Sequence, residues 1–151
     1  MINHIIEGET DILVAAYRQE KREIQKYSLA LHMFDDERSQ EFFDKLLKDE
    51  TLHLKMIRKR IEEHTPKFFE KYDDREIFEF RSCERKDGAI EPVDFLKYSL
   101  FEEKSGALFH NLLTGAVKSA PSVELFRELE AAETAHINSI KYEIDFLSKK
   151  K

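Results

Sequence analysis

Apolar side chains recur along most of this chain at the three- and four-residue spacing of amphipathic helices. Four such stretches cover about residues 9–34, 36–64, 92–118 and 121–147. Short turn-forming sequences separate the members of each pair, at Asp35-Asp36 and at residues 119–121. The pattern predicts an all-α protein in which two helical hairpins pack as an antiparallel four-helix bundle. We expect the whole chain, residues 1–151, to form one such domain.

Residues 65–91 join the two hairpins and show no helical period. Thr65-Pro66 ends the second helix, and Pro92 suits the first position of the third. A connection of this length predicts a crossover that runs back along the bundle, with a short helix near residues 67–72. Its large apolar residues indicate packing against the helices more than a function of their own. They are Phe68, Phe69, Tyr72, Ile77, Phe78 and Phe80.

A set of polar residues lies within the apolar faces and repeats at an offset of 83 residues. Each hairpin carries the pattern Glu-x6-(Tyr/His)-x22-Glu-x-x-His. The fixed offset leaves no choice among the many glutamates, so coincidence is a poor explanation. The first copy is Glu20, Tyr27, Glu50 and His53, and the second is Glu103, His110, Glu133 and His136.

The spacing predicts that these side chains meet at one level of the bundle. Residues three apart share a helix face, so each Glu-x-x-His pair points the same way. In an antiparallel hairpin, residues equidistant from the turn lie at the same height. The midpoint of Glu20 and Glu50 is residue 35, and that of Glu103 and Glu133 is residue 118. Both midpoints fall at the predicted turns, roughly 21–23 Å from the glutamates at 1.5 Å per residue.

Four carboxylates buried together would be severely unfavourable without protons or cations. Two divalent metal ions would balance four negative charges, and two imidazoles would complete the site. Carboxylate and imidazole ligands suit iron or manganese, with zinc as a less specific competitor. One Glu from each of two helices and Glu-x-x-His from the other two is the ligand set of ferritin-like di-metal carboxylate proteins.

Four segments carry a resemblance to the di-iron domain of the rubrerythrin branch of the ferritin-like family. They are EKREIQKYSLA, DETLHLKMI, FEEKSGALFHNLL and EAAETAHINSI, and the resemblance covers nearly the whole chain. It implies a centre of two iron ions. By resemblance, Glu50 and Glu133 would bridge the metals. Glu20 and Glu103 would be terminal ligands, and His53 and His136 would each hold one ion.

The chain departs from the family pattern at two positions. Peroxide-reducing rubrerythrins usually carry an extra glutamate three residues after the third-helix ligand, and Gly106 stands there. Glu23, at the pseudo-symmetric position, either substitutes for it or is a solvated residue that pairs with a nearby lysine. His110 stands where a tyrosine like Tyr27 is expected. It either hydrogen-bonds a ligating carboxylate, as Tyr27 should, or is satisfied by a backbone carbonyl.

The resemblance implies an oxidoreductase that reacts ferrous iron with hydrogen peroxide or oxygen. The rubredoxin module of full-length rubrerythrins is absent, and Cys83 is the one cysteine. Electrons would therefore come from an external donor, such as a rubredoxin-type protein. One alternative is an iron-handling protein that oxidises and stores or delivers iron without repeated turnover. Another is a non-catalytic bundle that retains the ligand geometry.

Charge and hydropathy limit the kinds of partner and the cellular location that we expect for this protein. The net charge is −6 and basic residues alternate with acidic ones, which disfavours nucleic-acid binding. No run approaches the length of a membrane span, and the first twenty residues lack a basic start followed by an apolar run. A cytoplasmic protein is the resulting expectation. Long amphipathic helices with much apolar surface also favour a homodimer.

Overall fold

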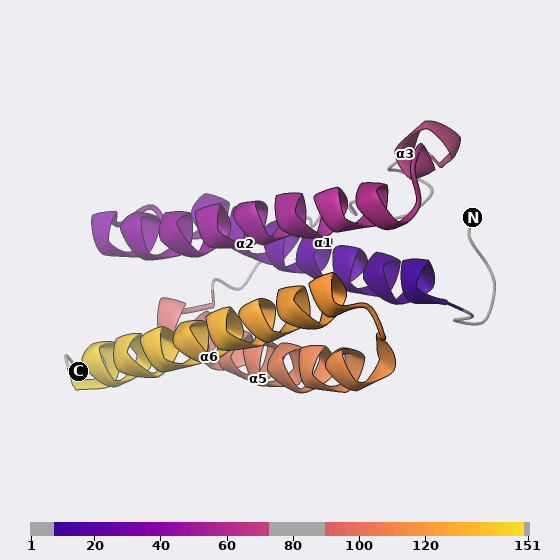
Figure 1. Cartoon of the computed structure of the whole chain (residues 1–151). Helices are drawn as coiled ribbons and strands as arrows, with labels where there is room; N and C mark the ends of the chain where they lie inside the picture. Colours follow the sequence, from indigo (N-terminus) through magenta and orange to yellow (C-terminus); the bar gives the residue numbers. More distant parts are fainter. Residues whose placement is uncertain (1–7, 73–89, 150–151) are drawn as a thin grey trace.

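The computed structural model describes residues 8–72 and 90–149, and every regular element among them is a helix (Figure 1). The predicted all-α bundle is confirmed, and the four long helices end within two residues of their predicted ends. Cys83 and the apolar residues of the connection beyond Tyr72 lie outside the described residues. The helices are α1 (Glu9–Met33), α2 (Glu37–His64), α3 (Phe68–Lys71), α5 (Pro92–Ala116) and α6 (Ala120–Lys149).

The long helices form two antiparallel hairpins that lie side by side (Figure 1). The first hairpin is α1 with α2, and the second is α5 with α6. Between the hairpins, α1 packs on α5 and α2 packs on α6. Helix α5 begins at the opposite end of the bundle from the end of α2 (Figure 1). The predicted crossover between them lies mostly outside the described residues.

The turn between α1 and α2 is closed by two side chains. Asp36 caps α2, and its carboxylate accepts a hydrogen bond from the Ser39 N–H at 3.0 Å. The Gln40 amide donates to the carbonyls of Leu31 at 2.7 Å and Phe34 at 2.5 Å, which would otherwise be unpaired at the end of α1. These local bonds explain why the helix breaks at the predicted acidic pair.

Glu9, at the start of α1, closes the turn between α5 and α6. Its carboxylate accepts from the backbone N–H groups of Lys118 at 3.3 Å and Ser119 at 3.0 Å. It also accepts from the hydroxyls of Ser119 at 2.6 Å and Ser122 at 2.9 Å. Burial alone would raise the pKa of Glu9, but the bonds from Ser119, Ser122 and Lys118 lower it to about 2. One carboxylate from the first hairpin thus holds the N-terminus of α6.

Replacing Glu9 by alanine should lower the free energy of unfolding by about 1–3 kcal/mol at neutral pH. A carboxylate whose pKa is lowered on folding stabilises the protein above its unfolded pKa near 4.5. That contribution is lost as the pH falls towards 2. Urea unfolding at pH 7 and pH 2.5 should therefore show a difference between variant and wild type that shrinks in acid. A difference of equal size at both pH values would contradict this role, and the exposed Glu128→Ala is the control.

Two apolar clusters fill the two ends of the bundle, and a polar layer separates them. In α1, for example, Tyr17 belongs to one cluster and Ala30 to the other. In α2, Phe43 belongs to the second cluster and Ile57 to the first. Every long helix crosses from one cluster to the other, so each contributes side chains to the layer between them.

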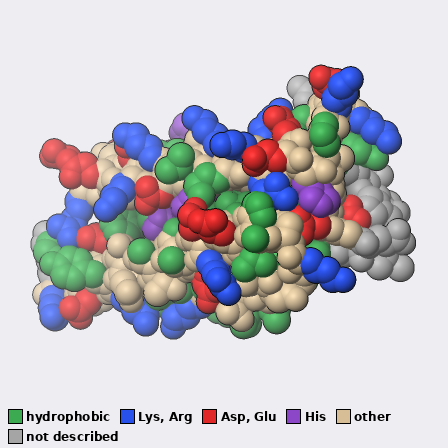
Figure 2. Space-filling view, viewed as in Figure 1, with side chains coloured by type: hydrophobic (Ala, Val, Ile, Leu, Met, Phe, Trp, Pro, Cys, Tyr) green, Lys and Arg blue, Asp and Glu red, His purple; other side chains and the backbone are tan. Residues whose placement is uncertain are grey.

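The part of the connection that the structure describes packs against the first cluster. Phe68 is buried, and the rings of Tyr17 and Phe69 lie 5.5 Å apart. The predicted short helix is present there as α3. On the face shown in Figure 2, basic and acidic side chains are interspersed. Within residues 8–72 and 90–149, no helix combines the length and apolarity that a membrane span requires.

Candidate metal centre

The six predicted ligands meet in the polar layer, and all are buried. They form two groups, within each of which one potential ligand atom per residue lies within 4.8 Å of the others. Glu50 is a member of both groups. The first group is Glu20, Glu50 and His53, and the second is Glu50, Glu103, Glu133 and His136.

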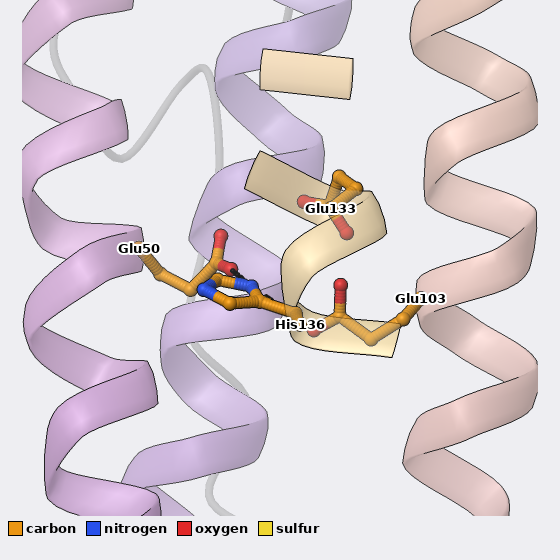
Figure 3. A group of neighbouring side chains, drawn as sticks. All are labelled: Glu50, Glu103, Glu133 and His136. Atoms are coloured by element: carbon orange, nitrogen blue, oxygen red, sulfur yellow. Dashed lines mark ion pairs between the residues drawn. The ribbon is translucent and has the colours of Figure 1, made fainter. Parts of the chain in front are cut away.

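The helices aim these side chains at a common space. Figure 3 shows Glu50 of α2, Glu103 of α5 and the pair Glu133 and His136 of α6 pointing towards one another. The i, i+3 spacing places His136 one helical turn from Glu133 on the same face of α6. The shared position of Glu50 matches the bridging role that the resemblance implies. Glu133 belongs to the second group alone, so its bridging role stays a prediction.

His136 is held from both sides. Its Nδ1 atom lies 2.9 Å from Glu50 Oε1 and 3.8 Å from Glu103 Oε1. Its Nε2 atom lies 3.0 Å from Asp49 Oδ2. A carboxylate on the outer nitrogen fixes the orientation of a ligating imidazole and makes it more basic. Asp49 therefore belongs to the site as the group that orients His136.

The sequence analysis missed Asp49. The offset of 83 residues that identified the ligands places Ala132 at the matching position, so the repeat gives no signal there. The available signal was its position directly before Glu50. Asp49 also lines a cavity of about 150 Å³ between α2 and α6, beside His136, Ser139 and Lys45.

The shifts in pKa divide the four carboxyl groups into two pairs, one raised and one lowered. Burial, followed by the charge of Glu50, raises the pKa of Glu20 well above its usual value. Burial and contact with Glu103 raise the pKa of Glu133 in the same way. Burial opposes ionisation of Glu50 and Glu103 too. Contacts with Glu20 and His136 nevertheless lower the pKa of Glu50, and contacts with Glu133 and His136 lower that of Glu103.

His136 supplies positive charge to this cluster. Burial lowers its pKa, but its contacts with Glu103 and Glu50 outweigh that effect and raise the pKa to about 10. The raised pKa values of Glu20, Glu133 and His136 favour protonation, which relieves the negative charge of the layer. Metal cations would displace such protons, because a carboxylate or imidazole must lose its proton to become a ligand.

Buried polar atoms provide a test of whether the residues fit a metal. Several carboxylate oxygens and imidazole nitrogens of the layer make no well-directed hydrogen bond to the described residues. Such atoms are costly unless something pairs with them, and oxygen and imidazole nitrogen are donors for iron, manganese and zinc. The site could therefore hold metal. The atoms are both oxygens of Glu20 and Glu50, Oε2 of Glu103 and Glu133, and Nδ1 of His53 and His136.

The two residues predicted to support the ligands behave differently. The fully buried Tyr27 donates a hydrogen bond from its hydroxyl to Oε1 of Glu103. His110 is also fully buried, with Nε2 4.0 Å from Glu20 Oε1. Neither of its ring nitrogens bonds to a described residue, so neither predicted bond forms. Burial lowers the pKa of His110 to about 4, which leaves the ring neutral at pH 7.

Glu23 lies beside the site, where it pairs with a lysine. Its Oε2 atom is 2.6 Å from Nζ of Lys26, and both side chains are buried. The Gln19 amide donates to its other oxygen at 3.4 Å. Burial raises the pKa of Glu23 to about 8, although Lys26 lowers it in part. The predicted lysine pair is present, but the prediction that Glu23 is solvated is wrong, because neighbouring helices bury the pair. Glu23 belongs to neither ligand group among the described residues.

Gly106 lies against Glu133. A Cβ atom at this position would be 3.3 Å from Glu133 Oε2 and 3.6 Å from the Gln19 amide nitrogen. The Glu133 carboxylate thus occupies the space into which any side chain at residue 106 would project. A glutamate at residue 106, as in the family pattern, would therefore require the Glu133 carboxylate to lie elsewhere.

The comparisons with known proteins bear on the fold. No protein-family model matches the chain, and no curated protein matches its sequence. Among solved structures, the chain is similar to a two-domain protein from Anabaena variabilis that contains DJ-1/ThiJ/PfpI-like and ferritin-like domains. The TM-score is 0.69 at 10% sequence identity, and the match covers 94% of this chain and 37% of that one. The likeness supports a ferritin-like bundle and extends to the fold alone.

Proposed function

We propose that this chain is a rubrerythrin-like di-iron oxidoreductase that reduces hydrogen peroxide, or oxygen, with electrons from a separate donor protein. The observation that carries the proposal is the membership of Glu50 in two buried ligand groups drawn from all four long helices. A carboxylate shared in this way would hold two ions close enough to act on one small molecule. Glu20 and His53 would complete one ion's ligands, and the ligands on α5 and α6 would complete the other's.

Iron suits the proposal better than zinc, which has no redox chemistry. Two ferrous ions, when bound, would supply the two electrons that, with two protons, convert hydrogen peroxide into two water molecules. The chain's own residues would position the ligands. Tyr27 holds Glu103 through its hydroxyl, and Asp49 holds His136 through its outer nitrogen.

The packing around the layer favours a small substrate. The apolar clusters close the bundle above and below the ligands. The cavity between α2 and α6, at about 150 Å³, is large enough for peroxide or oxygen, and the ligand His136 forms part of its wall. We assign it as the route for the oxidant and for protons from solvent.

Electrons would come from outside the chain. A single cysteine cannot supply the thiolate cage of a rubredoxin-type iron. An external reductant of that type would reduce the centre after each turnover. The reducing conditions that such a donor needs place the proposed activity in the cytoplasm.

Anaerobic reconstitution with Fe(II), followed by peroxide titration, tests the proposal. We expect two iron ions per chain, both oxidised by one equivalent of peroxide, and renewed oxidation after each addition of reductant. Glu133→Ala should abolish peroxide consumption, whereas the exposed Glu128→Ala on the same helix should leave it unchanged.

Three results would each exclude the proposal. A protein that stays metal-free after incubation with Fe(II) or Mn(II) would be a non-catalytic bundle. Iron that accumulates far beyond two ions per chain would indicate storage. Unchanged peroxide turnover in Glu133→Ala would place the chemistry elsewhere.

A further inference from the structure

Helix α5 carries a second apolar stripe, on the side facing away from the bundle. Its members are separated by three, seven and four residues, and the exposed Ser105 lies at its centre. Their exposed fractions run from 56% to 69%, so the bundle leaves them uncovered. The four residues, which we call the α5 stripe, are Tyr98, Phe101, Leu108 and Leu112.

None of these four residues lies on the inner face of α5, which packs in the bundle. Leu96, Glu103, His110 and Val117 recur every seven residues and are buried in the bundle. The stripe follows the same seven-residue repeat on the opposite side of the helix. Large apolar residues at alternating spacings of three and four form the seam of a helix pair. Helix α5 thus has one apolar face that packs in its own bundle and a second apolar face that is exposed.

The exposed area of the stripe is that of a large surface patch. Four such side chains expose roughly 400–500 Å² per chain, as much as the largest apolar patch of a typical monomer, and such patches are often functional. Two stripes facing each other would bury roughly 800–1,000 Å², which is the size of a weak, reversible interface. A symmetric pair brings two identical stripes together, so the surface needs no further component.

We propose that a second copy of this chain covers the α5 stripe, with the two α5 helices side by side and parallel. Charge favours this direction. The exposed Lys97 and the half-buried Glu102 flank the seam on opposite sides, five residues apart. In a parallel pair that spacing brings Lys97 of one copy to Glu102 of the other. An antiparallel pair would instead bring the exposed Lys104 close to its own symmetry mate.

Analytical ultracentrifugation tests the interface. The wild-type protein should sediment as a dimer of the 17.9 kDa chain. Phe101→Glu and Leu108→Glu should each give monomers, because a carboxylate on the seam would be buried without a partner. Leu52→Glu is the matched control, since Leu52 is 58% exposed on α2, outside the stripe. Unchanged helical circular dichroism and metal content in the variants would show that the bundle and its metal site persist.

A monomeric wild type at micromolar concentration would overturn the proposal. Dissociation by Leu52→Glu with no effect of the two stripe variants would also overturn it.

Cross-linking tests the direction of the helices. In a Cys83→Ser background, Leu112→Cys should form an intermolecular disulfide, because residue 112 meets its symmetry mate in a parallel pair. In an antiparallel pair centred on Ser105, the two copies of residue 112 would lie roughly 21 Å apart. A dimer that fails to cross-link at residue 112 would contradict the parallel arrangement. Leu52→Cys in the same background controls for random collision.

Discussion

Glu50→Ala is expected to abolish the binding of both metal ions, whereas Glu20→Ala should remove one. Glu50 contributes to both ligand groups, while Glu20 contributes to one. Loss of an outer-shell partner typically lowers metal affinity 10–100-fold, and loss of a shared ligand should lower it by more than 100-fold. Anaerobic titration with Co(II), followed by its visible absorption, gives the affinity and the number of ions per chain.

Without metal, Glu50→Ala should lower the thermal unfolding midpoint relative to the wild type. The substitution removes the ionised carboxylate that contacts Glu20 and His136 in the buried layer and leaves His136 without that partner. Metal addition should raise the midpoint of the wild type alone. Two bound ions in Glu50→Ala would show that this residue does not join the two groups.

Lys26→Met is expected to destabilise the protein by about 3–5 kcal/mol at pH 8, the cost of leaving a buried charge without its partner. Glu23 and Lys26 form a close ion pair in the interior. Glu23 has a pKa raised to about 8, so its stabilising contribution is present below pH 4.5 and is lost as the pH rises through 8. Without Lys26 that pKa rises further. The destabilisation measured by urea unfolding should therefore be larger at pH 8 than at pH 5.5.

The double variant Glu23→Gln with Lys26→Met is the matched control. It removes both charges, so it should recover most of the stability that Lys26→Met loses. A loss that is the same at both pH values, or that persists in the double variant, would mean that Lys26 acts through packing of its methylene stem. Exposed Lys48→Met, which breaks the surface pair with Asp44, should leave the free energy of unfolding nearly unchanged.

Helical periodicity and the internal repeat predicted the bundle and the residues that meet in its polar layer. The repeat worked because the ligands must lie at one height, which ties their spacing to the turns. The role of Asp49 was not predicted, because the residue 83 positions later is Ala132 and an acidic residue on a helix is ordinarily solvated. The burial of Lys26 was not predicted either, because a lysine on a helix is also ordinarily solvated. Such features depend on which faces of neighbouring helices meet, and a single helix pattern does not contain that information.

The positions of Gly106 and His110 show a second limit. Sequence identified Gly106 as a departure from the family pattern, but its close approach to Glu133 appears only when α5 and α6 are packed. For His110, two hydrogen bonds were expected as alternatives, and neither nitrogen bonds to a described residue. Both outcomes depend on atomic distances of a few tenths of an ångström, which residue types and spacing do not determine.

The metal ligands come from both hairpins, and this arrangement has a consequence for the lifetime of the protein. Each hairpin packs more extensively within itself than against the other. An ion held by Glu50 together with Glu103 would join the two hairpins and act as a cross-link. Under our proposal, iron starvation would remove that cross-link, so the bundle would open more often and proteases would cleave the open form more often. The abundance of the protein in a cell would then follow the supply of iron, even at a constant rate of synthesis.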